Sequence, residues 1–108
     1  LDVRATEEWT GANLMGVKRS GHIPSAVHLE WNATMNSTTK QFKSAAELRQ
    51  IFQQLGVTPD KEIITYCLIG IRASHTLFTL RLLGYDKVRN YDGSWAEWGN
   101  RDDLPIER

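Results

Sequence analysis

The chain has 108 residues, of which 41% are hydrophobic and 24% are charged, and both values are ordinary for a globular domain. Thirteen basic residues balance thirteen acidic ones, so no overall field attracts nucleic acid or an anionic membrane surface. No stretch is apolar enough to cross a bilayer, and the single cysteine excludes a disulfide framework and a zinc site built from cysteines. We therefore expect one cytoplasmic domain, residues 1–108, with no nucleic-acid or membrane partner.

The N-terminal segment begins with a short predicted strand. Residues 1–3 favour a strand that places Arg4 at its carboxyl end, and Thr6 can cap the short helix that follows. Because the chain begins inside this strand at Leu1, without an initiator methionine, we expect a fragment that lacks its first residues.

The middle of the chain contains a second short strand and a well-capped helix. Residues 26–29 favour the strand, whereas residues 31–42 are polar and weakly periodic, which is typical of a loop. Ser44 and Glu47 form a capping box that starts the helix, and Gly56 supplies its stop. The apolar face of this helix consists of Leu48, Ile51, Phe52 and Leu55.

The stretch from Glu62 to Ser74 organises the rest of the predicted fold. Its first part contains Ile63, Ile64 and Tyr66, the dense β-favouring run expected of a strand that is covered on both faces, and it stops at the only cysteine. From residue 73 onward apolar residues recur at helical spacing. This predicted helix face consists of Ala73, Leu77, Leu80 and Gly84, widened by Phe78 and Leu83.

The last predicted elements are a strand at residues 87–91 and a compact turn or short helix at residues 93–99. Strands that alternate with helices predict an α/β fold in three layers, with a central, mostly parallel sheet flanked by helices on both faces. Sites in such sheets form beyond the carboxyl ends of the strands. Since Arg4, Cys67 and Asp92 each follow a predicted strand, we expect them to converge on one rim.

The sequence Cys67-x-x-Gly70-x-Arg72 forms a loop at the start of a predicted helix. The first N–H groups of a helix lack intrahelical partners and carry the positive end of its dipole, so a thiol held there ionises more easily than a free one. Gly70 allows the loop to turn sharply, and Arg72 adds a fixed positive charge. A lone cysteine is more often a small buried hydrophobe, but this position favours a nucleophile.

The segment Cys67–Ala73 resembles the active-site loop of the rhodanese (sulfurtransferase) family. Further segments resemble the family's other motifs in the expected order, although Ser25 stands where the family usually has glycine. These segments are residues 1–4, 21–26, 91–95 and 104–107. The chain is most similar to the catalytic C-terminal domain of two-domain thiosulfate sulfurtransferases, which implies a rhodanese-like fold and a second rhodanese-like domain in the full-length chain.

The resemblance also implies a mechanism that needs no cofactor or metal. Cys67 would take the sulfane sulfur of a small anionic donor such as thiosulfate as a persulfide and pass it to cyanide or a thiol. The active-site loop that stabilises this sulfur would comprise Leu68, Ile69, Gly70 and Ile71. Because Leu68 and Ile69 differ from the small residues typical of mercaptopyruvate users, we favour thiosulfate as donor.

Four further residues receive roles at this site. We expect Arg72 and Arg4 to bind the anionic donor, although a surface ion pair for Arg72 and a structural salt bridge between Arg4 and Asp2 are alternatives. Ser94 and Trp95 are candidates for the pocket wall, and simple packing is the alternative for Trp95.

Two other functions remain open from the sequence. A cysteine-dependent phosphatase or arsenate reductase also uses a cysteine, a backbone anion cradle and an arginine. Its loop has five residues between cysteine and arginine, whereas only residues 68–71 intervene here. The second alternative is a non-catalytic rhodanese-like module that binds partners; such modules often lose the cysteine or the glycine, and this chain keeps both.

Overall fold

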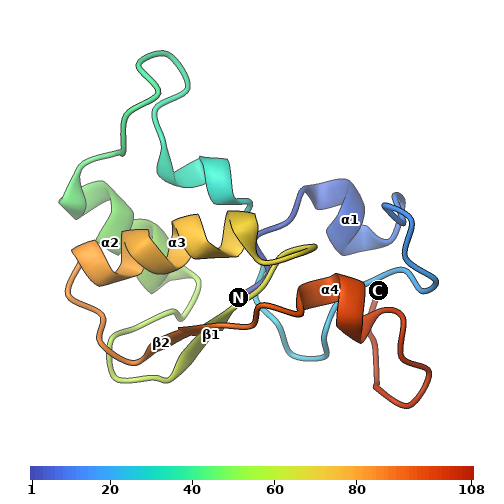
Figure 1. Cartoon of the computed structure of the whole chain (residues 1–108). Helices are drawn as coiled ribbons and strands as arrows, with labels where there is room; N and C mark the ends of the chain where they lie inside the picture. Colours follow the sequence, from blue (N-terminus) through green and yellow to red (C-terminus); the bar gives the residue numbers. More distant parts are fainter.

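The computed structural model describes all 108 residues and contains a small parallel sheet (Figure 1). Strands β1 (Ile63–Thr65) and β2 (Val88–Asn90) pair in parallel, with Ile63 opposite Val88. Asp2 forms parallel bridges with Tyr66 on one side and with His28 on the other. The order across the sheet is therefore His28, Asp2, β1, β2, and the predicted mostly parallel α/β sheet is confirmed. The strands expected at residues 1–3 and 26–29 are reduced to single bridges.

Helices α2 (Ala45–Gln54) and α3 (Ile71–Leu82) pack on one face of the sheet. The capping box of α2 is confirmed, because Ser44 Oγ accepts the N–H of Glu47 at 3.2 Å. α3 begins two residues before Ala73, since Gly70 turns the loop directly into the helix. The core between these helices and the strands contains Leu48, Phe52, Val57, Ile63, Leu80, Leu83, Tyr85 and Val88.

The opposite face of the sheet is covered by α4 (Ser94–Trp98) and by the chain around Val17. Trp95 of α4 packs there against Tyr66. Ile64, on the same face, is 47% exposed, so the prediction that this strand is covered on both faces is wrong at Ile64. The reason is that α4 reaches only the carboxyl end of β1.

Two further predictions are wrong at the level of single residues. Thr6 is the first residue of α1 (Thr6–Thr10) rather than its cap, and the Ala5 N–H at the cap position binds Glu8 Oε2 at 3.0 Å. Phe78 does not widen the core face of α3, because it is 54% exposed while Thr76 and Thr79 are buried in its place.

The segment at residues 31–42 contains more structure than the predicted loop. It begins with the 3-10 helix η1 (Trp31–Thr34), and an antiparallel bridge joins Met35 to Phe42. η1 packs against α3. None of the helices is both long and apolar enough to span a membrane.

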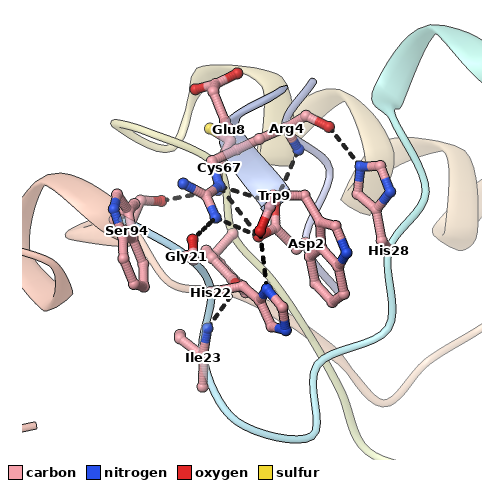
Figure 2. Close-up of polar contacts among 12 residues, drawn as sticks. Asp2, Arg4, Glu8, Trp9, Gly21, His22, Ile23, His28, Cys67 and Ser94 are labelled. Carbon is pink, nitrogen blue, oxygen red and sulfur yellow. Dashed lines mark hydrogen bonds and ion pairs between the residues drawn. The ribbon is translucent and has the colours of Figure 1, made fainter. Parts of the chain in front are cut away.

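A fully buried ion pair joins Asp2 and Arg4 at the carboxyl end of the sheet. Arg4 Nη2 lies 2.7 Å from Asp2 Oδ2, and Arg4 Nε lies 3.0 Å from both carboxylate oxygens. Arg4 Nη2 also donates to the carbonyl of Gly21, so the pair ties the bridge at Asp2 to the turn at residues 21–24 (Figure 2). The guanidinium carbon lies 4.7 Å from the centroid of the Trp95 ring, within the range of a cation–π contact.

We expect Asp2→Asn to lower the free energy of unfolding by about 3–5 kcal/mol, because it leaves the buried Arg4 charge without a counter-charge. Urea unfolding followed by circular dichroism measures this loss. Asp103→Asn is the matched control, since it removes the same charge from the exposed pair with Arg101 and should leave the unfolding midpoint nearly unchanged. Equal shifts of the unfolding midpoint in the two variants would show that burial of the Asp2 pair adds nothing to its contribution to stability.

Candidate active site

Cys67 lies at the carboxyl end of β1, one residue beyond the bridge at Tyr66, and its side chain is buried. Two backbone N–H groups point at its sulfur: that of Gly70 at 3.1 Å and that of Ala73 at 3.4 Å. Because the N–H groups of the first helical turn have no carbonyl partner of their own, they are free to bind an anion. The sulfur therefore occupies the anion position of a helix N-terminus.

Gly70 makes this geometry possible because its φ is +96°, a conformation that other residues rarely adopt. A Cβ atom at this position would also lie 3.2 Å from the carbonyl oxygen of Asp92. The carbonyl of Gly70 accepts the hydroxyl of Ser74 at 2.8 Å and the side-chain amide of Asn90 at 3.3 Å. The turn is thus fixed both by its backbone conformation and by contacts from α3 and β2.

α4 holds the reactive loop from the side opposite α3. The N–H of Cys67 donates to Ser94 Oγ at 3.2 Å, and the N–H of Trp95 donates to the carbonyl of Cys67 at 2.9 Å. The N–H of Ala96 donates to the carbonyl of Leu68, also at 2.9 Å. Ser94 has a φ of +52°, which is uncommon for a residue other than glycine.

Ser94 and Trp95 therefore lie behind Cys67 rather than beside an open cavity. Both side chains are buried, and Trp95 packs between Val17 and Tyr66. The largest groove of the protein, about 680 Å³, lies elsewhere, over Ile64 on the uncovered part of the sheet, and contains neither residue. The contacts at the sulfur, and not this groove, define the candidate site.

Arg72 stands at the start of α3 and is held by Glu8 of α1. Its Nη1 and Nη2 atoms donate to the two carboxylate oxygens of Glu8 at 2.8 and 2.9 Å, and the Glu8 side chain is buried whereas that of Arg72 is 26% exposed. Hydrogen bonds to Glu8 raise the pKa of Arg72 against the opposing effect of burial, and the charge of nearby Cys67 acts in the same direction as Glu8. Burial acts to raise the pKa of Glu8, but the hydrogen bonds from Arg72 and Ala5 outweigh it and lower this pKa.

Arg4, Cys67 and Asp92, which the sequence predicts to converge on one rim, have different environments in the structure. Cys67 and Asp92 lie close together, since the backbone of Asp92 borders Gly70 of the loop. The guanidinium of Arg4 is buried and is occupied by Asp2 and Gly21, so the structural salt bridge expected as an alternative is present.

The remaining loop residues are apolar, and they differ in their exposure to solvent. Ile69 and Ile71 are 58% and 71% exposed, and Leu68 is partly buried. No group of three or more histidine, cysteine, aspartate or glutamate side chains is arranged to hold a metal ion.

Sequence reasoning missed two residues that the structure brings to the site. Glu8 has no role in the site predicted from the sequence, and Asn90 lies there only within the strand predicted at residues 87–91. A buried partner for Arg72 was foreseeable from its charge, but nothing in the sequence places the short helix at residues 6–10 next to the loop 64 positions later.

Comparisons with known proteins agree on one family. Residues 1–101 match the family described as Rhodanese-like domain. The sulfur carrier protein TtuD of Thermus thermophilus is 45% identical over 116 residues, which cover all of this chain and 40% of TtuD. The thiosulfate sulfurtransferase of Pseudomonas aeruginosa is 39% identical over 106 residues, which cover 98% of this chain and 38% of that protein. The chain thus spans about two fifths of the length of these relatives.

Solved structures give the same result. An EanB variant described as a cysteine persulfide in a tetrahedral intermediate state with ergothioneine superposes with a TM-score of 0.90 and 30% identity, over 98% of this chain and 27% of that one. The anaerobic ergothioneine biosynthesis enzyme of Chlorobium limicola, in complex with trimethyl histidine, superposes with a TM-score of 0.90 and 29% identity. The match again covers 98% of this chain and 27% of that one.

We expect Gly70→Ala to lower both stability and thiol reactivity. The positive φ costs a residue with a Cβ about 1–2 kcal/mol, and moving the Gly70 N–H away from the sulfur should slow alkylation of Cys67 by iodoacetamide roughly tenfold. Gly84→Ala is the matched control, because Gly84 has a φ of +91° in open space at the far end of α3. It should cost similar stability without slowing alkylation, and equal slowing in both variants would contradict the role of the loop.

Proposed function

Because the chain belongs to the rhodanese-like domain family, we propose that Cys67 transfers a sulfane sulfur from thiosulfate to cyanide or to a thiol. The observation that carries this proposal is the pair of backbone N–H groups aimed at the Cys67 sulfur from the start of α3. Such donors favour a thiolate, which is the nucleophilic form of cysteine.

In the first half-reaction, the Cys67 thiolate attacks the outer sulfur of thiosulfate. A new S–S bond forms at Cys67, the S–S bond of thiosulfate breaks, and sulfite leaves with its electron pair. In the second half-reaction, cyanide or an acceptor thiolate attacks the outer sulfur of the Cys67 persulfide. Thiocyanate or an acceptor persulfide leaves, and the Cys67 thiolate is regenerated, so the kinetics should be ping-pong.

The loop N–H groups would stabilise both the thiolate and the persulfide, because each carries its negative charge in the same cradle. The loop concerned comprises Leu68, Ile69, Gly70 and Ile71. Arg72 is our candidate for binding the anionic end of the donor, since its guanidinium is partly exposed beside the loop and is held in place by Glu8. We assign Arg4 to the structural salt bridge rather than to direct donor contact, because its side chain is buried and its Nε and Nη2 atoms bind Asp2 and Gly21. Ser94 would set the position of the Cys67 backbone rather than line a pocket.

The family comparisons support this reading over the alternatives. Relatives named thiosulfate sulfurtransferase support thiosulfate as the donor, and the persulfide described for EanB supports a cysteine-bound sulfur. The name of TtuD, a sulfur carrier protein, supports a role in carrying sulfur. Since those relatives are more than twice as long as this chain, we further propose that a second rhodanese-like domain contributes to the site in the full-length protein.

The proposal is tested by a thiocyanate assay with thiosulfate and cyanide, together with the intact mass after thiosulfate alone. The wild-type chain should gain the mass of one sulfur atom and turn over, whereas Cys67→Ser, which keeps the shape of the side chain, should do neither. Turnover by Cys67→Ser would overturn the assignment of the nucleophile. A wild-type chain that gains no sulfur from thiosulfate or mercaptopyruvate would favour the non-catalytic module.

A further inference from the structure

The buried carboxylate of Glu8 has no part in the sulfur-transfer steps, yet it binds Arg72 at the start of α3. Its two oxygens bind both Nη atoms of Arg72, and one of them also accepts the N–H of Ala5. A bidentate arrangement of this kind fixes the plane of a guanidinium as well as its distance. α1 therefore holds Arg72 at the start of α3.

The pair has an electrostatic consequence for the loop. With Glu8 ionised, the side chains of Glu8 and Arg72 carry no net charge together, and the sulfur faces the neutral N–H groups of Gly70 and Ala73. An unpaired Arg72 would instead present a full positive charge, partly exposed to solvent, to any anion that approaches Cys67. One unit charge at such short range changes the local concentration of anions severalfold.

We propose that Glu8 is a positioning residue that offsets the charge of Arg72. It thereby lowers the preference of Cys67 for anionic over neutral reagents. Glu8 touches no reacting atom and acts only through Arg72. This inference rests on the proposed function to the extent that Cys67 is the reacting group.

The preference is measured by two alkylating reagents of nearly equal shape. Iodoacetate is an anion and iodoacetamide is neutral; with each, the Cys67 thiolate forms an S–C bond and iodide leaves with its electron pair. The ratio of the two rates reports the charge at the loop, because the fraction of thiolate affects both rates equally. We expect Glu8→Gln, which is similar in shape and keeps hydrogen-bonding groups for Arg72 and Ala5, to raise this ratio about three- to tenfold.

The matched control is Glu7→Gln, which makes the same change of charge on an exposed neighbour in α1 and should leave the ratio nearly unchanged. The double variant Glu8→Gln, Arg72→Gln removes the whole pair and should return the ratio to near its wild-type value. If Glu8 has only a structural role, its substitution should change the alkylation rates of both reagents by the same factor. That result would overturn the proposal. An equal rise in the ratio for Glu7→Gln would overturn it as well.

The outcome is independent of turnover. If Glu8→Gln raises the ratio while thiosulfate leaves no sulfur on the wild type, the charge assignment stands and the proposed function fails. If the wild type forms the persulfide and the ratio does not move, the function stands and the role of Glu8 fails.

Discussion

The buried pair of Asp2 and Arg4 is the interaction on which the rest of the structure depends. Burying two charges is costly unless their hydrogen-bonding groups are satisfied, and here the guanidinium contacts both Asp2 oxygens and the Gly21 carbonyl. The same guanidinium lies over the ring of Trp95, the first-turn residue of α4 whose N–H binds the Cys67 carbonyl. The buried charge of Arg4 thus supports the helix that holds the reactive loop.

The loop itself is held between two helices that perform different tasks. α3 supplies the N–H groups that face the sulfur, and α4 supplies the contacts of Ser94 and Trp95 that fix the Cys67 backbone. Positive φ values occur on both sides of the loop, at Gly70 and at Ser94. Conformations of this kind persist only where the surrounding contacts determine them, which is consistent with a preorganised site.

Much of the fold was predictable because its signals are local. The capping box at Ser44, the strand before Cys67 and the helix after it each depend on neighbouring residues, and so does the α/β alternation. The errors arose where tertiary contacts decide. Phe78 fits an apolar helix face by spacing but is exposed, because Thr76 and Thr79 occupy the buried side of α3 instead. Similarly, the cysteine loop was visible in the sequence, whereas its partners Glu8 and Asn90 come from α1 and β2, and no spacing rule relates them to the loop.

The charge balance at the site follows from the same tertiary contacts. An arginine in the motif suggests a cation at the sulfur, but Glu8 neutralises that arginine from a helix about sixty positions earlier in the chain. The backbone N–H groups of Gly70 and Ala73 bind the sulfur, and the Arg72 guanidinium, paired with Glu8, lies near it. Hydrogen bonds from such backbone donors are stronger where water is excluded. The helix fixes their orientation, so they need not reorganise when an anion binds. The loop therefore presents fixed backbone donors to a small anion, beside an arginine whose charge is offset by Glu8.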